Sequence, residues 1–201
     1  MGQAENGPVA PGSTSTSGST PTSGSAVHAL RSSDPVLRAA AQLFYARGIS
    51  AVSVQDIRAQ AGTSLKAMYA RYPSKEHLVV AYLEETHAAW MQDLRTALAD
   101  SQPGTDQVQA LFTWLEQWFT APDFAGCGIA NTRGQAIGDR ARAVVRTHVA
   151  ELEQLCAQVG GGPESGRSLL LLVEGAIATA AATGDPGAAR EAHALAVRAL
   201  S

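Results

Sequence analysis

The 201-residue sequence has few of the residue patterns that build catalytic or metal sites. Its two cysteines, Cys127 and Cys156, have no C-x-x-C spacing and are expected to be buried free thiols. Its five histidines show neither H-x-x-x-H nor H-E-x-x-H spacing, and phosphate loops, G-x-S-x-G elbows and dinucleotide fingerprints are missing. We therefore expect a protein that is not an enzyme and that needs no metal or other cofactor.

Large apolar residues are almost absent from residues 1–26, which are mostly Gly, Ser, Thr and Pro. Such a segment buries too little surface to offset its ordering entropy, so we expect a disordered tail there. The tail has no basic start followed by an apolar stretch, and no later run is a clear membrane span. These features predict a cytoplasmic protein that has no membrane partner.

Positive charge is in the minority overall, since the formal net charge is −3. Residues 27–78 nevertheless contain seven Lys or Arg against three acids, a balance of +4 that leaves −7 for the rest of the chain. This asymmetry would place a positive field on the N-terminal region, as nucleic-acid binding requires. A solvated charged face would give the same count.

Two short helical patterns separated by a glycine turn lie within residues 53–78. Ser53 and Asp56 have the spacing of a capping box before a helix over 54–61. Gly62 then supplies the residue at which a left-handed backbone ends that helix at little cost. The pattern predicts the first helix and the turn of a helix-turn-helix.

The second short helix is expected over 65–71, between a cap at Ser64 and a stop at Pro73. The N-terminal residues of a recognition helix meet base edges, whereas flanking caps and turns meet phosphates. Leu65 would touch a thymine methyl group or pack against Tyr69. The candidate DNA-binding residues are Ser53, Ser64, Leu65, Lys66, Ala67, Tyr69, Tyr72 and Lys75.

This stretch resembles the DNA-binding segment of the tetracycline-repressor (TetR) family of bacterial regulators. The family pattern I-A-x-x-A-G-V-S-x-x-x-L-Y-x-Y-F-P-S-K-E-x-L is matched at Ile57, Ala61-Gly62, Ser64, Tyr69, Pro73-Ser74-Lys75-Glu76 and Leu78. Arg58 and Thr63 depart from the pattern. The resemblance implies double-stranded DNA with a palindromic operator, a small-molecule effector and a second copy of the chain as partners.

The remaining helical patterns complete an all-α fold. A bracing helix is expected over 34–47, and the later helices over 74–101, 106–120, 137–159, 165–182 and from Asp185-Pro186 onward. The expected architecture has about nine helices, with a three-helix, helix-turn-helix DNA-binding domain at 27–78. Residues 79–201 would form a helical ligand-binding and dimerisation domain.

Aromatic residues are concentrated in the middle of this second domain. They are expected to be core, or to line an apolar pocket with a few polar groups, and the family's pocket lies in this part of the fold. The candidate ligand-binding residues are Trp90, Trp114, Trp118, Phe119, Phe124, Cys127, Asn131 and Glu174. Glu174, an acid in the most apolar helix, would either face an Arg or the end of a neighbouring helix, or offer a polar group to the pocket. His148, on an apolar stripe, is expected to be a hydrogen-bonded, half-buried side chain.

Small side chains in the helix over 165–182 would let two helices approach closely. In the family, the last two helices pair with their copies across a two-fold axis. The candidate dimer-interface residues are Leu171, Gly175, Ala178, Ala182 and Leu195. The expected function is a homodimeric DNA-binding transcriptional regulator, a repressor relieved by an apolar or amphipathic small molecule, with activation left open. The alternative is a helical protein-interaction module without specific DNA binding.

Overall fold

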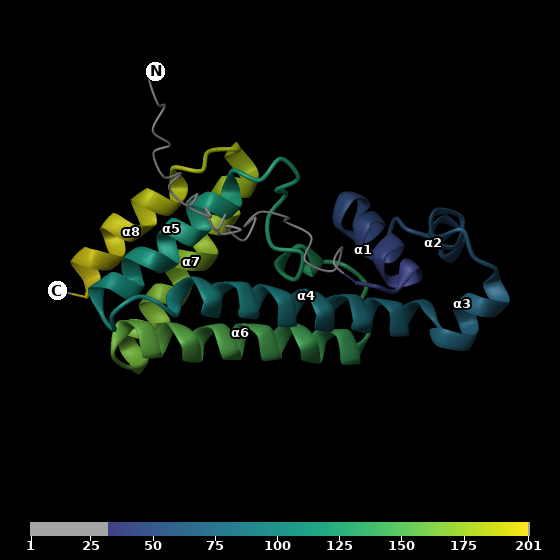
Figure 1. Ribbon diagram of the computed structural model, residues 1–201, viewed down its shortest axis with the longest axis horizontal. Coiled ribbons are helices and arrows are strands. Elements are labelled where there is room, and N and C mark those ends of the chain that lie inside the picture. The colour runs from purple at the N-terminus through teal and green to yellow at the C-terminus, as the bar shows by residue number, and fades with distance from the viewer. Residues whose placement is uncertain (1–31, 201) are drawn as a thin grey trace, which may run out of the picture.

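The computed structural model describes residues 32–200, so the expected tail at 1–26 lies outside the described residues. All regular secondary structure within this range is helical (Figure 1), which confirms the all-α class and approximates the expected number of helices. The elements are α1 (Pro35–Arg47), α2 (Val54–Ala61), α3 (Leu65–Arg71), α4 (Lys75–Leu98), α5 (Thr105–Phe119), the 3-10 helix η2 (Ala130–Thr132), α6 (Asp139–Gly160), α7 (Pro163–Thr183) and α8 (Ala188–Ala199).

Local capping sets the boundaries of the first helices. Asp34 accepts a hydrogen bond from the Val36 N–H at 3.0 Å, and Pro35 occupies the first turn, where its missing N–H has no cost. The last helix begins later than expected, at Ala188, because the Asp185 carboxylate accepts the Gly187 N–H at 2.7 Å in a turn before the helix.

Helix α4 connects the two ends of the molecule. Its 24 residues span about 36 Å at 1.5 Å per residue. Helices α1, α2 and α3 lie at its N-terminal end, and α5, α7 and α8 lie toward its other end, while α6 runs alongside it (Figure 1). A shift of α4 would therefore move the helices packed against it at both ends of the molecule.

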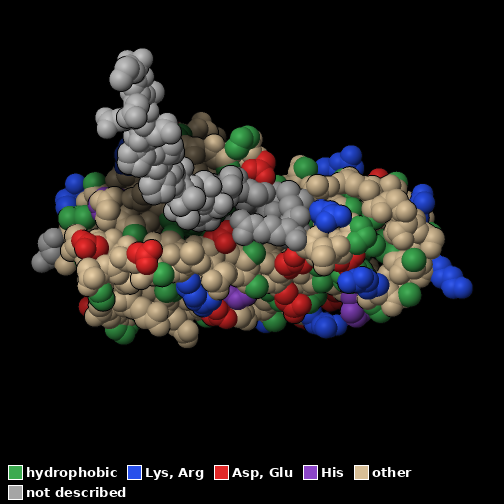
Figure 2. Space-filling model, viewed as in Figure 1, with side chains coloured by type: hydrophobic (Ala, Val, Ile, Leu, Met, Phe, Trp, Pro, Cys, Tyr) green, Lys and Arg blue, Asp and Glu red, His purple; other side chains and the backbone are tan. Residues whose placement is uncertain are grey.

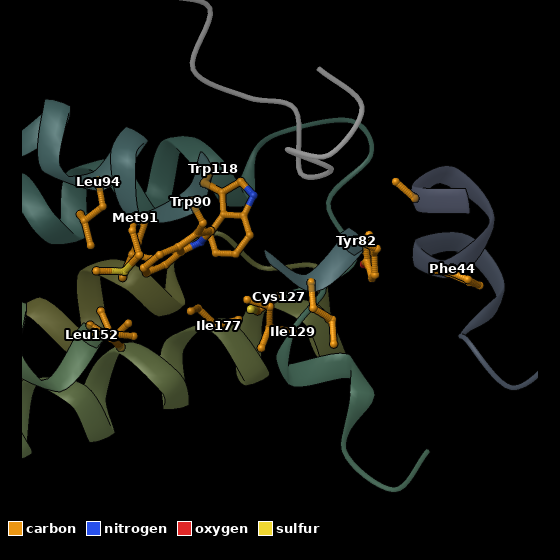
Figure 3. Close-up of a cluster of buried hydrophobic side chains, with 14 of the residues drawn as sticks. Phe44, Tyr82, Trp90, Met91, Leu94, Trp118, Cys127, Ile129, Leu152 and Ile177 are labelled. Atoms are coloured by element: carbon orange, nitrogen blue, oxygen red, sulfur yellow. The ribbon is translucent and has the colours of Figure 1, made fainter. Parts of the chain in front are cut away.

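A continuous apolar core fills both parts of the structure. Ile57, Met68 and Leu78 are at most 1% exposed and join α2, α3 and the start of α4. Figure 3 shows the core continuing from Phe44 and Tyr82 at the α1–α4 contact to the side chains around Trp90 and Trp118. The burial of these side chains supplies most of the driving force for folding.

Helix α7 is an apolar helix packed within the fold. It is the one helix among the described residues that is long and apolar enough to cross a membrane by length and composition. It packs against α6 and α8 (Figure 1), and at Gly166 it approaches α6 so closely that an added Cβ would lie 2.6 Å from the Ala157 Cα. In the structure 39% of its apolar window is buried, on the side packed against α6 and α8, and the opposite side is exposed.

The segment between α5 and α6 is hydrogen-bonded to the region around α1. The Tyr45 hydroxyl accepts the Ala125 N–H at 2.6 Å and donates to the Gly126 carbonyl at 3.0 Å. The Gln135 Oε1 accepts the Ser50 N–H at 3.2 Å, just after α1. The N-terminal helices are thus held by this segment as well as by α4.

Candidate nucleic-acid interface and aromatic cluster

Helices α2 and α3 form the helix-turn-helix expected from the sequence. The capping box is present, with the Ser53 N–H donating to Asp56 Oδ2 at 2.8 Å and the Asp56 N–H donating to Ser53 Oγ at 3.2 Å. These bonds from Ser53 lower the pKa of the Asp56 carboxyl group. Gly62 has the expected left-handed conformation, with φ at 63°, and Ser64 Oγ accepts the Ala67 N–H at 3.1 Å to start α3.

The outer surface of α3 is free of contacts with the core. Lys66, Ala67 and Tyr69 are exposed, and the Tyr69 side chain is 44% exposed. Met68, one residue earlier than Tyr69, is 1% exposed and holds the inner face of the helix. Leu65 is half-buried against the core, and its contact with a thymine methyl group stays a prediction.

Asp34 ties the end of α3 to the start of α1. Its carboxylate accepts the Tyr72 hydroxyl in a short hydrogen bond and also pairs with Arg71 Nε at 2.9 Å. Burial and the neighbouring carboxylate raise the pKa of Tyr72 to about 12. Tyr72 was expected to contact DNA, and this contact stays a prediction. In the structure its hydroxyl donates a hydrogen bond to Asp34 within the protein. The sequence showed Asp34 as a helix cap and gave no sign of this second role.

Lys75 is half-buried at the start of α4. Its ammonium donates to the Ile49 carbonyl at 2.6 Å and lies 6.0 Å from the centroid of the Phe44 ring. Burial lowers the pKa of this lysine. Lys75 thus fastens α4 to the turn after α1, and its contact with a DNA phosphate stays a prediction.

Basic side chains surround the end of the molecule that carries α2 and α3. Figure 2 shows Lys and Arg side chains around this end, while acidic side chains gather mainly along the middle of the same face. The separation agrees with the +4 balance counted from the sequence. A positive end attached to an acidic body would orient the chain toward a polyanion.

The aromatic side chains expected to line a pocket form a closely packed cluster. Trp90 from α4 meets Trp114 and Trp118 from α5 at ring-centroid distances of 5.1 and 6.0 Å, and Phe124 meets Trp118 edge-on at 5.2 Å. Figure 3 shows Trp90 and Trp118 side by side. We call Trp90, Trp114, Trp118, Phe119 and Phe124 the aromatic cluster. Its first four members are each at most 6% exposed. The sequence left core and pocket as alternatives. The four helical members are packed in the core of this structure, and their role in ligand binding stays a prediction.

The other residues expected at the pocket are divided between the core and the surface. Cys127 is buried, and burial raises the pKa of its thiol to about 11, which leaves it protonated and unreactive. Asn131 is exposed and its amide donates to the Ala125 carbonyl at 2.8 Å, which braces the loop around Gly126. Glu174 forms an ion pair with Arg133, so the first of its two expected roles is present.

A pair of histidines, His148 buried and His87 half-buried, joins α4 to α6 beside the aromatic cluster. The Nδ1 atoms of His87 and His148 are 3.1 Å apart, and the His148 ring lies edge-on to Trp90 at 5.2 Å. His148 is 2% exposed, more buried than expected. Burial lowers its pKa to about 4, with a smaller contribution from His87 in the same direction. The two histidines are 61 positions apart in the sequence, so no local spacing indicates this pair.

The residues expected at a dimer interface form an exposed stripe on α7 and α8. Leu171 is 64% exposed and Leu195 is 47% exposed, and Gly175, Ala178 and Ala182 are exposed on the same length of α7. A shallow groove of about 170 Å³ between the two helices includes Leu171, Gly175 and Leu195 in its lining. Exposed leucines next to small side chains form a surface that another helix can approach closely.

The N-terminal part of the chain matches a known family of bacterial regulatory proteins. The profile described as "Bacterial regulatory proteins, tetR family" matches residues 36–82, which run from α1 into the first part of α4. No curated protein matches the chain.

Solved structures resemble the chain over most of its length. A TetR-family transcriptional regulator from Streptomyces coelicolor is 27% identical, with a TM-score of 0.70 over 83% of this chain and 92% of that one. A transcriptional regulator of the TetR family from Agrobacterium tumefaciens superposes with a TM-score of 0.73 over 82% of this chain and 95% of that one, at 18% identity. The likeness therefore includes the C-terminal helices as well as the helix-turn-helix.

Proposed function

Because the chain belongs to the tetR family of bacterial regulatory proteins and is a transcriptional regulator, we propose that it acts as a homodimeric repressor. Each copy would place α3 in the major groove of one half of a palindromic operator. An apolar or amphipathic small molecule bound in the 79–201 domain would release the DNA. A repressor of this kind works in the cytoplasm, where its DNA is.

The presentation of α3 carries this proposal. Lys66 and Ala67 project from the N-terminal turn of a short helix whose inner face is fixed by Met68 and whose ends are capped. Side chains at this position reach base edges when such a helix enters the major groove. We assign base contacts to Lys66 and Ala67, and phosphate contacts to Ser53, Ser64, Tyr69 and Lys75.

Dimerisation through α7 and α8 would supply the second recognition helix. One seven-residue helix reads only a few base pairs, so a two-fold dimer is needed to match a palindromic site. The stripe of Leu171, Gly175, Ala178 and Ala182 supports this assignment because small residues allow close helix approach and the leucine supplies apolar area.

Helix α4 offers the connection between effector and DNA. It begins with Lys75 beside the N-terminal helices and carries Trp90 in the aromatic cluster. A ligand that binds the DNA-incompetent state more tightly would move α4 and change the spacing of the two recognition helices. Converting a population ratio of about 99:1 to 1:99 needs a preference of roughly 5.5 kcal/mol, so weakly discriminating ligands would derepress only in part.

A DNA-binding titration tests the proposal. Labelled DNA from upstream of the chain's own gene is titrated with the full-length protein, and anisotropy is followed at several salt concentrations. Lys66→Ala should weaken specific binding by roughly 1–3 kcal/mol and relax the preference at one base position. Arg167→Ala is the control, since this exposed arginine near the start of α7 pairs with Glu153 in the C-terminal part of α6, toward the end of the molecule opposite α3 (Figure 1).

Two results would contradict the proposal. Equal affinity for upstream and unrelated DNA, at every salt concentration, would favour a helical protein-interaction module. If Lys66→Ala and Arg167→Ala both behaved like the wild type on specific DNA, α3 would not read bases through Lys66. Lys75→Ala should weaken binding to all sequences alike and lower the salt slope by about one.

A further inference from the structure

Two indole N–H groups in the aromatic cluster are buried without a hydrogen-bond partner. Among the residues that the structure describes, the buried side-chain nitrogen and oxygen atoms that lack a partner are Trp90 Nε1, Trp118 Nε1 and His193 Nε2. Trp90 is 1% exposed and Trp118 is 3% exposed, so water does not satisfy either donor from the surface. A neighbouring ring face is a weaker partner for an N–H than an oxygen atom is.

Both donors belong to rings in direct contact. The Trp90 and Trp118 centroids are 6.0 Å apart with an angle of 71° between the ring planes (Figure 3). Buried polar groups in native proteins nearly always have a partner, and an exception calls for a cause such as a ligand. Two exceptions in adjacent rings of one cluster indicate a place prepared for a hydrogen-bond acceptor.

The buried polar side chain in contact with the cluster is uncharged. The buried polar or charged side chains of the described residues are Asp34, Thr86, Thr132 and His148, and the His148 ring contacts Trp90 of the cluster. Burial lowers its pKa to about 4, so it is neutral near pH 7. A charged ligand would lose its hydration here without gaining an opposite charge. The environment therefore selects an uncharged ligand.

Phe124 occupies the edge of the cluster. Its ring lies 5.2 Å from Trp118 and 5.0 Å from Phe119, yet it comes from the irregular segment between α5 and η2 and is only half-buried. The other cluster members are held on the helices α4 and α5. Phe124 is thus the member that can leave with the least disruption, and a flat apolar molecule can take its place against Trp118.

We propose that the aromatic cluster binds an uncharged, flat and mostly apolar molecule that carries an oxygen acceptor on its edge, such as an aromatic ketone. Phe124 moves aside to admit this molecule. Trp90 and Trp118 then donate their indole N–H groups to its oxygen. This inference rests on the proposed function, because it names the effector class for the effector site placed in the 79–201 domain. It adds the chemistry of the ligand and the roles of the two donors.

The test compares two probes that differ in one carbonyl group. Calorimetric titration of the full-length protein, without DNA, measures the dissociation constants of 1-tetralone and of its parent hydrocarbon tetralin. Trp118→Phe and Trp90→Phe should each weaken tetralone about tenfold relative to tetralin, which corresponds to about 1.4 kcal/mol. Trp114→Phe is the matched control and should affect both probes alike, because the Trp114 nitrogen is not one of the unpartnered atoms.

Two further measurements do not depend on the stability of those variants. In wild-type protein with 15N-labelled tryptophan, tetralone should shift two of the three indole N–H signals downfield, and tetralin should not. Phe124→Ala should strengthen the binding of both probes, because it removes the side chain that they displace.

Several results would overturn the inference. These are no binding of tetralone to wild-type protein, equal losses for both probes in the Trp90 and Trp118 variants, or tighter binding of a naphthyl trimethylammonium cation than of tetralone. Because these titrations contain no DNA, such a failure is separate from a failure of operator binding. A chain that binds its operator but not tetralone would keep the proposed repressor and lose only this ligand class.

Discussion

Acidification should destabilise the fold through His148. Burial holds the pKa of this side chain at about 4, against 6.5 for the exposed group. A histidine with a lowered pKa in the folded state takes up protons preferentially when unfolded. Its neutral form therefore contributes stability that is complete above about pH 6.5 and is lost as the pH falls toward 4.

The size of the loss follows from the two pKa values. Between about pH 7.5 and pH 5, proton linkage at this one site lowers the free energy of unfolding by about 2 kcal/mol, and the limit below pH 4 is about 3.4 kcal/mol.

The titratable groups near His148 are His87 and Glu151. The Nδ1 atoms of His87 and His148 are 3.1 Å apart, and the Glu151 carboxylate lies 3.5 Å from His87 Nε2. Glu151 opposes the shift of the His148 pKa, and His87 adds to it.

Urea denaturation at a series of pH values measures this loss. Tryptophan fluorescence and circular dichroism should give coincident transitions, and the protomer concentration must be held constant because an oligomer unfolds with a concentration-dependent midpoint. His148→Gln removes the titrating group and should flatten the profile by about 2 kcal/mol over the same pH interval. Parallel profiles for the wild type and His148→Gln would refute the argument, whatever their absolute stabilities.

Three other substitutions test the packing of the fold and of the proposed dimer. Gly166→Ala should lower the free energy of unfolding in urea by about 1–3 kcal/mol, because the new Cβ would lie 2.6 Å from the Ala157 Cα. Unchanged stability would mean that α6 and α7 separate easily. Tyr45→Phe removes two hydrogen bonds to the segment before η2 and should lower the free energy of unfolding by about 1–2 kcal/mol. Amide exchange at Ala125 should become faster, and exchange at the wild-type rate would contradict the hydrogen bond between this amide and Tyr45. Gly175→Leu should yield a folded monomer in sedimentation. The single chain should still fold because a Cβ at this position meets nothing within 4 Å, whereas the larger side chain would obstruct close approach of a second α7. An intact dimer would remove this part of α7 from the interface.

Local interactions explain why the helix-turn-helix could be predicted from the sequence. A cap such as Ser53 or Ser64 bonds to an N–H three residues later, and the αL turn at Gly62 depends on a single residue type. These interactions join residues close in the chain, so their spacing can be read directly. The same reasoning located the exposed stripe on α7, because helical periodicity determines which residues share a face.

Contacts between distant segments were decided by the tertiary structure alone. Tyr72 was assigned to DNA from its place near α3, and this assignment stays a prediction. The structure adds a hydrogen bond from its hydroxyl to Asp34, 38 residues earlier. The sequence left core and pocket open for Trp90 and Trp118, because helical spacing does not reveal which rings from two helices will meet. The partners of Tyr45, 80 residues on, and the pairing of His87 with His148 were equally hidden. Such pairs depend on how the helices pack against one another, and that packing is a property of the whole chain.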